Sequence, residues 1–339
     1  MSSPTAEKAP APARPAAAAA APAPAEAPSG PAAPAGPPAP APARPAPRTE
    51  EAGPRKRIKE MEVMVAEARV ETPDTTTLVL FTGNDHLDYR PGHFLTIDPH
   101  QFEALDRFIA YFEDQKGKKE PPRAYSMSSS PHERYLAVTV KEERYQSGQT
   151  RYPPLLSPML VKRTTRGMRL VVTGFTGPYV LPDDVESRTD HLVHVVAGSG
   201  AVPNFSILKW SLVHHPGLRH TFLCSNKTWE DVIFRDELAQ LERTYPERLR
   251  VVHALTRDPV TPASHGVWKG RVSAATLRAL IPDPKACLVY ACGPAIGPHE
   301  KAAAATRGEA PAPRFLEAAL QALAEVGVPE ASVKRESYG

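Results

Sequence analysis

Cysteine is scarce in this chain of 339 residues, and its scarcity excludes several kinds of protein. The three cysteines, Cys224, Cys287 and Cys292, are too few for a disulfide scaffold or for an iron–sulfur cluster held by four thiolates. They form no C-x2-C pair, and no pair of histidines downstream completes a zinc site. The twelve histidines are scattered along the chain, so we predict no metal centre.

Long hydrophobic runs are also absent. No uninterrupted apolar stretch approaches the roughly 18 residues that a membrane-spanning helix needs. The N-terminal stretch has neither the apolar centre of a signal peptide nor the Arg- and Ser-rich pattern of a transit peptide. We therefore expect a cytoplasmic protein with reduced thiols and no membrane span.

The body of the chain lacks net charge. Residues 1–57 contain seven of the 41 lysines and arginines but only four of the 38 acidic residues. Residues 58–339 keep 34 of each, so the whole net charge of +3 lies in the N-terminal stretch. Because binding to nucleic acid needs a basic face, we expect no nucleic-acid partner.

Residues 1–57 are dominated by alanine and proline and hold 16 of the 39 prolines. Proline fixes φ and removes a backbone donor, and alanine leaves little surface to bury. The composition predicts a disordered, extended tail. It is either compositional drift without a function or a tether for a partner.

Residues 58–186 consist of short alternating apolar segments separated by turn signals such as Gly83-Asn84-Asp85 and Arg90-Pro91-Gly92. This pattern is typical of antiparallel strands and predicts a β-barrel. The expected strands are Met61–Val70, Thr76–Phe81, Phe94–Ile97, Tyr135–Val140 and Met168–Val172.

Residues 187–339 alternate strand-like and helix-like runs, which predicts a parallel sheet in an α/β domain. The expected strands are Leu192–Ala197, His220–Cys224, Leu249–Leu255 and Cys287–Ala291, and the expected helices are Phe205–His214, Phe234–Tyr245, Ala274–Leu280 and Arg314–Val326. The predicted fold is thus β followed by α/β: an antiparallel β-barrel and then a nucleotide-binding domain.

A glycine-rich turn follows the first strand of the α/β domain. Gly198, Ser199 and Gly200 stand between an apolar strand and a helix, and Pro203 suits the first turn of that helix. Such a turn lets the backbone approach a pyrophosphate, and the helix N-terminus attracts it. The alternative is a turn that only reverses the chain.

Four motifs occur in order and together resemble the ferredoxin–NADP reductase family, above all the reductase components of bacterial oxygenases. They are Arg123-Ala124-Tyr125-Ser126, Gly198 to Pro203, Cys292-Gly293-Pro294 and Glu336-Ser337-Tyr338. The segments Leu136–Lys141 and Asn226–Asp236 are similar as well. The resemblance covers residues 58–339 and implies an FAD-binding barrel in 58–186 and an NAD(P)-binding domain in 187–339.

The resemblance implies a flavin site in the barrel. Arg123 would bind the FAD diphosphate, Tyr125 would lie against the ribityl chain or flavin, and Ser126 would place its hydroxyl near N5. Ser157 would begin a helix facing phosphate, although Pro154 stands where relatives often have glycine. An exposed arginine and a tyrosine that fills the barrel are the alternative. The implied flavin-binding residues are Arg123, Ala124, Tyr125, Ser126, Val140 and Ser157.

The resemblance also implies a nicotinamide site. Cys292 would lie beside the nicotinamide ring, unless it is a small buried hydrophobic residue. Val202 replaces a family threonine, which we expect to weaken or retune nucleotide binding. The implied residues are Gly198, Ser199, Gly200, Pro203, Cys292, Gly293 and Pro294.

The last residues match the end of plant-type relatives, in which an acid and an aromatic residue lie at the flavin. Glu336 and Tyr338 would take these roles, with Tyr338 covering the flavin; the alternative is an edge strand that ends in a surface tyrosine. Oxygenase reductases commonly continue into a 2Fe–2S ferredoxin domain. This chain lacks the cluster cysteines, so we expect its electron acceptor to be a separate protein.

Ser225, Asn226 and Lys227 follow a strand where relatives meet the adenosine ribose. A hydroxyl and a cation suit a 2′-phosphate, whereas an acid, absent before Glu230, would suit a free diol. The sequence therefore favours NADPH, with NADH as the alternative.

We expect a monomeric, FAD-dependent oxidoreductase that takes electrons from NADPH and passes them to ferredoxin or a similar iron–sulfur or flavodoxin carrier, as in oxygenase systems. Ser126, Cys292, Glu336 and Tyr338 are the expected catalytic residues. The alternatives are a reductase of free flavin or ferric chelates and a catalytically weak, nucleotide-binding scaffold subunit.

Two segments depart from the family pattern, His100–Pro122 and Pro298–Pro313. Lys116, Lys118 and Lys119 in the first are hypothesised to dock an acidic ferredoxin; a solvated charged loop is the alternative.

Overall fold

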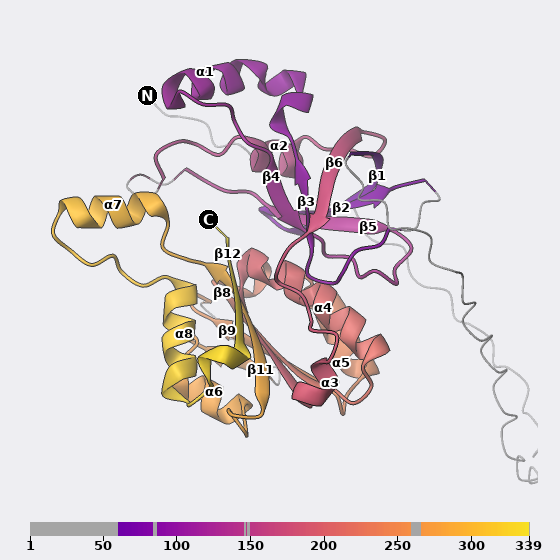
Figure 1. Cartoon of the computed structure of the whole chain (residues 1–339), viewed down its shortest axis with the longest axis vertical. Helices are drawn as coiled ribbons and strands as arrows, with labels where there is room; N and C mark the ends of the chain where they lie inside the picture. The colour runs from indigo at the N-terminus through magenta and orange to yellow at the C-terminus, as the bar shows by residue number, and fades with distance from the viewer. Residues whose placement is uncertain (1–59, 84–86, 146, 148–149, 259–265, 339) are drawn as a thin grey trace, which may run out of the picture. The chain divides into compact units, whose positions relative to one another are not determined.

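The computed structural model describes residues 60–83, 87–145, 147, 150–258 and 266–338 (Figure 1). The tail predicted for residues 1–57 lies outside these ranges. Within them, no helix has the length and apolar character needed to cross a membrane. The same residues contain no group of three or more His, Cys, Asp or Glu side chains that could hold a metal ion.

The first sheet is antiparallel, and in the described part of the chain its strand order is β4-β3-β6-β1-β2-β5. A bridge between Met127, just after β4, and Val138 in β5 joins the two ends of the sheet. Buried residues such as Leu78 and Leu95 fill the interior. The predicted antiparallel β-barrel is confirmed. Its strands are β1 (Met61–Thr72), β2 (Thr75–Phe81), β3 (Phe94–Ile97), β4 (Arg123–Ser126), β5 (Leu136–Lys141) and β6 (Arg169–Thr176).

The second sheet is parallel throughout, with the order β10-β9-β8-β7-β11-β12 among the described residues. All seven residues of β7 are buried, as expected for a strand whose two faces are both covered. The predicted parallel α/β fold is confirmed. The strands are β7 (His191–Ala197), β8 (Arg219–Asn226), β9 (Leu249–Leu255), β10 (Val267–Lys269), β11 (Cys287–Pro294) and β12 (Val333–Tyr338).

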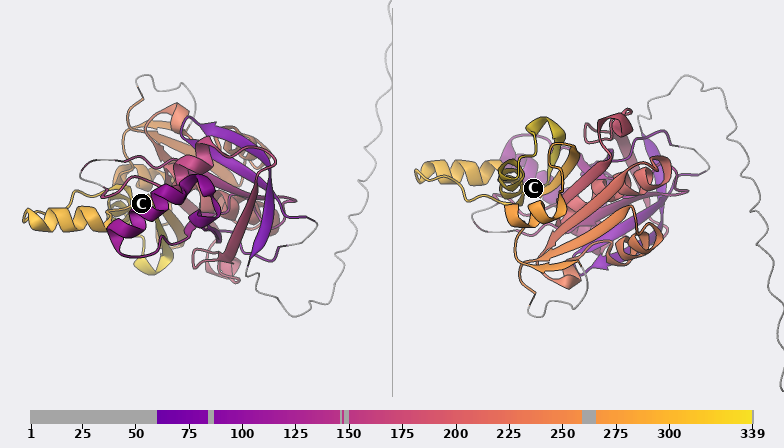
Figure 2. Two further views of the ribbon diagram at one scale, coloured as in Figure 1. Left: turned by 90° about the horizontal axis from the view of Figure 1, so that it is seen from above. Right: turned by 90° about the horizontal axis from the view of Figure 1, so that it is seen from below.

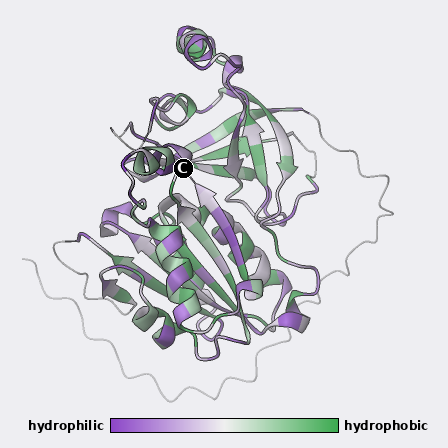
Figure 3. Cartoon of the chain, turned by 60° about the vertical axis from the view of Figure 1, so that its left-hand side comes forward, coloured by the Kyte–Doolittle hydropathy of each residue, from purple (hydrophilic) through white to green (hydrophobic). Residues whose placement is uncertain are grey.

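Helices cover both faces of the parallel sheet (Figure 2). Residues of α4 and α5 pack on one face, and residues of α6 and α8 pack on the other. Figure 3 shows hydrophobic residues concentrated on the strands. The helices of this half are α3 (Val185–Arg188), α4 (Ala201–His214), α5 (Arg235–Thr244), α6 (Ala274–Leu280), α7 (Pro298–Thr306) and α8 (Phe315–Glu325).

Helix α1 (Asp106–Lys116) lies within His100–Pro122, so the alternative of a solvated charged loop does not describe this segment. It buries Ile109 and Phe112, which explains the aromatic and aliphatic residues of the segment. The other departing segment, Pro298–Pro313, likewise begins with a helix, α7. Among the described residues of the barrel half, α2 (Leu156–Lys162) is the other α-helix.

Lys116 does not have the free ammonium group that docking would require. It forms an ion pair with Glu120, whose side chain is 1% exposed. Its Nζ atom also lies 4.8 Å and 4.7 Å from the ring centroids of Phe112 and Tyr152. The docking hypothesis therefore keeps only Lys118 and Lys119, which are exposed.

Candidate active site

The glycine turn between β7 and α4 is shaped by its contact with β11. Gly198–Gly200 forms a single 3-10 turn, in which Gly198 has a φ of +52°. A Cβ atom at Gly200 would lie 2.1 Å from the carbonyl oxygen of Cys292, so only glycine allows this approach. The N-terminus of α4, with its unpaired N–H groups, consequently lies at the carboxyl end of the parallel strands.

The start of α4 contains Pro203 and Val202, the two residues of the predicted nucleotide site that lie on the helix. Pro203 is the third residue of the helix, where a missing N–H breaks no intrahelical hydrogen bond. Val202 is 2% exposed and packs in the apolar cluster formed with α5. Val202 therefore makes a core contact at the position where the resemblance implies a threonine hydroxyl, while half-buried Ser199 belongs to the turn.

Strands β11 and β12 bring Cys292 and Glu336 together. Their register pairs Cys292 with Glu336 and Pro294 with Tyr338, and β7 pairs Val196 with Cys292. Burial raises the pKa of the Cys292 thiol well above its usual value, and the neighbouring Glu336 carboxylate raises it further. Cys292 is therefore a neutral thiol at ordinary pH, next to the glycine turn.

A short chain of polar groups links the barrel to the end of β12. The hydroxyl of Ser126, the last residue of β4, is hydrogen-bonded to the hydroxyl of Tyr338. The Tyr338 hydroxyl donates to Oε2 of Glu336 at 3.4 Å. Burial raises the pKa of Glu336 to about 7. This carboxyl group can therefore gain or lose a proton near neutral pH.

The four expected catalytic residues, Ser126, Cys292, Glu336 and Tyr338, thus lie in one cluster. The alternative of an edge strand describes β12 correctly, since β12 is the last strand of its sheet. Tyr338 is half-buried against Ser126 rather than free on the surface.

The Arg123–Ser126 segment forms β4, with Ala124 exposed and Tyr125 half-buried against the barrel core. Arg123 is partly engaged: its Nη2 atom lies 2.6 Å from Oε2 of Glu120, and its Nη1 atom donates to the carbonyl of Pro121 at 2.6 Å. A guanidinium has five N–H donors, so hydrogen atoms remain for a ligand.

Val140 and Ser157 are the two other expected flavin contacts. Val140 is 1% exposed, and its side chain belongs to the barrel core. Ser157 lies at the start of α2, and its hydroxyl accepts a hydrogen bond from the Glu143 N–H at 3.1 Å. The structure thus joins Ser157 to the chain that follows β5.

The barrel residues fit a ligand that carries both phosphate and a flat ring. Arg123 has spare donors and a side chain that is 36% exposed, while Tyr125 is partly exposed. The Ser128 hydroxyl is buried and has no hydrogen-bond partner in the described part of the chain. A buried hydroxyl without a partner is costly, and a bound polar ligand would relieve that cost.

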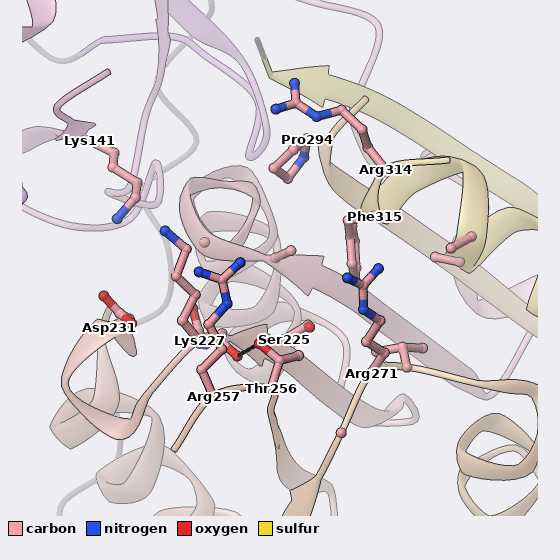
Figure 4. Close-up of a pocket in the computed structure, with 17 residues that line it drawn as sticks. Lys141, Ser225, Lys227, Asp231, Thr256, Arg257, Arg271, Pro294, Arg314 and Phe315 are labelled. Atoms are coloured by element: carbon pink, nitrogen blue, oxygen red, sulfur yellow. Dashed lines mark hydrogen bonds between the residues drawn. The ribbon is translucent and has the colours of Figure 1, made fainter. Parts of the chain in front are cut away.

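A pocket of about 640 Å³ opens at the carboxyl ends of β7, β8 and β9 (Figure 4). It collects five of the predicted binding residues: Gly198, Ser225, Asn226, Lys227 and Pro294. Ser199 and Gly200 of the turn, Pro203 of α4 and Gly293 of β11 do not line the pocket. A Cβ at Gly293 would lie 2.6 Å from Cδ1 of Phe315, a pocket residue, so Gly293 makes room for that ring.

The pocket is strongly positive. Its lining includes five cations, Lys141, Lys227, Arg257, Arg271 and Arg314, and a single acid, Asp231. In Figure 4, Lys141, Lys227 and Arg257 point into the pocket from one side and Arg271 enters from the other. Two of the cations are already paired, Lys141 with Asp74 and Arg314 with Glu300. Lys227, Arg257 and Arg271 are exposed and form no ion pair with any residue the structure describes.

Sequence reasoning missed Arg257, Arg271, Lys141 and Phe315. A signal for the first two was present, because Arg257 follows β9 and Arg271 follows β10, and ligands bind at the carboxyl ends of parallel strands. Nothing in the local sequence indicated that Phe315, at the start of α8, would face Gly293.

Comparison with known proteins agrees with this geometry. The family model of the oxidoreductase NAD-binding domain matches residues 195–296. The chain is 31% identical over 288 residues to the ferredoxin reductase component of 3-ketosteroid-9-alpha-monooxygenase from Mycobacterium tuberculosis, covering 82% of this chain and 65% of that protein. It is 33% identical over 214 residues to the component of the same name from Mycolicibacterium smegmatis, covering 61% of this chain and 53% of that protein. The chain thus spans less than two thirds of the length of both relatives.

Among solved structures, the FAD/NAD-binding domain of nitric oxide dioxygenase from Vibrio cholerae O1 biovar El Tor is similar in fold. The TM-score is 0.60 at 22% identity, and the match covers 82% of this chain and 98% of that one. At this identity the likeness concerns the fold alone.

Proposed function

Because the chain belongs to the ferredoxin–NADP reductase family, a family of oxidoreductases, we propose that it is an FAD-dependent NADPH oxidoreductase that delivers electrons to a separate one-electron carrier. One observation carries the proposal: Ser126 of the barrel meets Tyr338 and Glu336 at the end of the sheet, where the glycine turn touches Cys292. Residues that lie 212 positions apart in the chain thereby contribute to one site.

In this proposal the FAD is held by Arg123 at its phosphates and by the Tyr125 ring, with Ser126 at its reactive edge. Bound FAD would supply the redox chemistry, accepting a hydride from the nicotinamide and releasing electrons one at a time. The chain supplies binding, orientation and exclusion of water. Ser128 is the candidate for an additional polar contact, since its buried hydroxyl lacks a partner among the described residues.

In this proposal the hydrogen-bonded side chains of Ser126, Tyr338 and Glu336 orient the Ser126 hydroxyl and hold a proton. Tyr338 donates to the Glu336 carboxylate, which leaves the Tyr338 oxygen free to accept from Ser126. The Ser126 hydroxyl is thus oriented, and Glu336 can hold a proton at its carboxyl near pH 7. Cys292, buried and neutral, provides a small apolar wall rather than a nucleophile.

The positive pocket supports NADPH over NADH. The 2′-phosphate of NADPH is an additional dianion, and Lys227, Arg257 and Arg271 are cations without an ion-pair partner in the described chain. Ser225 at the end of β8 adds a hydroxyl. A site for the free ribose diol would instead need an acid here, and Asp231 already accepts hydrogen bonds from the Thr228 N–H and hydroxyl.

A ferredoxin or similar carrier is proposed as the acceptor because the mycobacterial relatives are named ferredoxin reductase components of a monooxygenase. Lys118 and Lys119, exposed after α1, are the remaining candidates for contact with an acidic carrier.

The experiment is reconstitution of the full chain with FAD followed by anaerobic titration. We expect a flavin spectrum that NADPH bleaches, and a kcat/KM for NADPH that exceeds that for NADH. Replacing Lys227, Arg257 and Arg271 by alanine should raise the KM for NADPH about 100-fold and leave the KM for NADH within a factor of about two. A protein that takes up no FAD would refute the oxidoreductase, whereas equal use of NADH would refute only the cofactor choice.

A further inference from the structure

Asn204, in the first turn of α4, is 0% exposed and uses its whole amide group. Its Nδ2 atom donates to the carbonyl oxygen of Gly200 at 3.1 Å and to the hydroxyl of Tyr179 at 3.0 Å. Its Oδ1 atom lies 2.8 Å from Nδ1 of His194. A buried polar side chain with every hydrogen-bonding group used holds its partners in one arrangement.

The first partner is the nucleotide turn itself. Gly200 ends the turn, and the position of a Cβ there is blocked by the carbonyl oxygen of Cys292 at 2.1 Å. Gly200 is therefore held between Asn204 on one side and Cys292 on the other. A shift of the turn would therefore either break the hydrogen bond from Asn204 or cause a steric clash with the backbone of β11.

The second partner belongs to the connection between the two sheets. Tyr179 lies between the end of β6 at Thr176 and the start of β7 at His191, and its side chain is 2% exposed. A Cβ at Gly92, in the turn before β3, would lie 2.0 Å from the carbonyl oxygen of Tyr179. Through Tyr179, Asn204 thus holds the nucleotide turn against a segment that packs on the barrel.

The third partner orients the amide. Because Nδ2 faces two acceptors, Oδ1 must accept, so neutral His194 carries its hydrogen on Nδ1. Nε2 of His194 is then an acceptor facing Nδ1 of His220 at 3.4 Å. His194 also stacks on Phe222, with ring centroids 5.1 Å apart. Both imidazoles are buried, and burial lowers the pKa of each, so they remain neutral.

We propose that Asn204 is a positioning residue for nucleotide binding and hydride transfer. It fixes the Gly198–Gly200 turn and, through Tyr179, fixes the position of the barrel-side segment relative to that turn. The proposal rests on the function proposed above. Asn204 touches neither cofactor in this scheme and acts through Gly200 and Tyr179. His194 is the residue that sets the direction of the Asn204 amide.

Other contacts should keep an Asn204 variant folded. The Ser130 hydroxyl donates to the carbonyl of Ser206 at 2.7 Å, and the Ser206 hydroxyl donates to the carbonyl of Ser129 at 2.6 Å. These bonds join α4 to the barrel without Asn204. Lys209 on the same helix also pairs with Glu133.

The test compares Asn204→Leu, which keeps the volume but cannot hydrogen-bond, with Tyr179→Phe, which removes only the hydroxyl. The matched control is Ser211→Ala on the same helix, where a buried hydroxyl has no hydrogen-bond partner in the part of the chain that the structure describes. Binding of NADP+ and of 2′-phospho-AMP is measured by calorimetry, and amide hydrogen exchange of residues 198–201 is measured in the nucleotide-free protein.

We expect Asn204→Leu to weaken NADP+ binding about tenfold and to change 2′-phospho-AMP binding by less than about twofold. The reason is that NADP+ has a pyrophosphate to place against the Gly198–Gly200 turn, whereas 2′-phospho-AMP has none. Exchange at residues 198–201 should speed up about tenfold in Asn204→Leu, less in Tyr179→Phe, and not in Ser211→Ala. Unchanged exchange and unchanged NADP+ affinity in Asn204→Leu would overturn the proposal. If the wild type binds neither nucleotide, the proposed function fails, while the exchange measurement still decides whether Asn204 holds the turn.

Discussion

The hydroxyl groups of Ser126 and Tyr338 are hydrogen-bonded although 212 positions separate the two residues in the chain. Ser126 ends a strand of the barrel, and Tyr338 ends the edge strand of the parallel sheet. Glu336, two residues before Tyr338, continues the chain of polar groups. The proposed chemistry depends on this contact, because it is where the two halves of the protein share functional groups.

Removing the Ser126 hydroxyl should slow catalysis without unfolding the protein. In Ser126→Ala, Tyr338 keeps its bond to Glu336 but loses its partner in the barrel. We expect kcat for NADPH oxidation to fall roughly 100-fold with little change in KM. This is the size of effect seen when an enzyme loses one preorganised hydrogen-bond donor that acts in the transition state. Thr164→Val is the control, since the Thr164 hydroxyl is buried and has no hydrogen-bond partner among the described residues. Equal kcat in the wild type and Ser126→Ala would contradict the role.

Arg123→Ala should weaken FAD retention far more than it affects folding. Glu120, the buried partner of Arg123, keeps its second ion pair with Lys116. Loss of charge-assisted hydrogen bonds to phosphate should weaken FAD binding about 10- to 100-fold, measured by fluorescence titration of the apoprotein. Arg169→Ala, which removes an exposed pair with Glu62, should bind FAD like the wild type. A loss of FAD in both variants would point to a general effect of charge instead.

The rate should depend on pH through Glu336, whose pKa burial raises to about 7. Above pH 7 the Glu336 carboxylate accepts a hydrogen bond from Tyr338. Below pH 7 the carboxyl group is neutral, and it no longer fixes the direction of the hydrogen bonds that run from Ser126 through Tyr338. We therefore expect kcat to fall as the pH drops below 7 and this inflection to vanish in Glu336→Gln. The stability effect has the opposite sign: a raised carboxyl pKa favours the folded state below the unfolded pKa near 4.5, and this contribution is lost as the pH rises through 7.

Acid should destabilise the fold through buried neutral histidines. Burial lowers the pKa of His253 to about 4 from 6.5, and Arg235 adds to the shift. A depressed histidine pKa means that the unfolded chain binds the proton first, so stability is full above pH 6.5 and declines toward pH 4. For His253 this shift corresponds to about 3 kcal/mol of stability lost between these pH values.

The variant His253→Phe keeps a ring against Trp229, whose centroid is 5.0 Å away. Urea unfolding from pH 7 to pH 4 should show a shallower loss of stability in this variant than in the wild type. If the unfolding free energies of the wild type and the variant fell in parallel with pH, the pKa of His253 would not differ between the folded and unfolded chain.

Much of the architecture follows from local sequence. The strand expected at Leu249–Leu255 and the helix expected at Ala274–Leu280 occur with those bounds, because periodic apolar residues report directly on which face is buried. Helix α1 was missed, since its segment reads as charged and aromatic rather than periodic. Because the helix was missed, the charge of Lys116 suggested a docking surface. The ion pair between Lys116 and Glu120 could be identified only from the structure.

The sequence alone was enough to indicate the β and α/β halves, the glycine turn and the order of the four motifs, because these depend on residue types at short spacing. Only the tertiary structure could bring Ser126 to Tyr338, direct Arg257 and Arg271 into one pocket with Lys227, and surround Asn204 with Gly200, Tyr179 and His194. These arrangements join residues that are distant in the chain or lie on different strands. Their geometry is set by strand order and register, which no short stretch of sequence specifies.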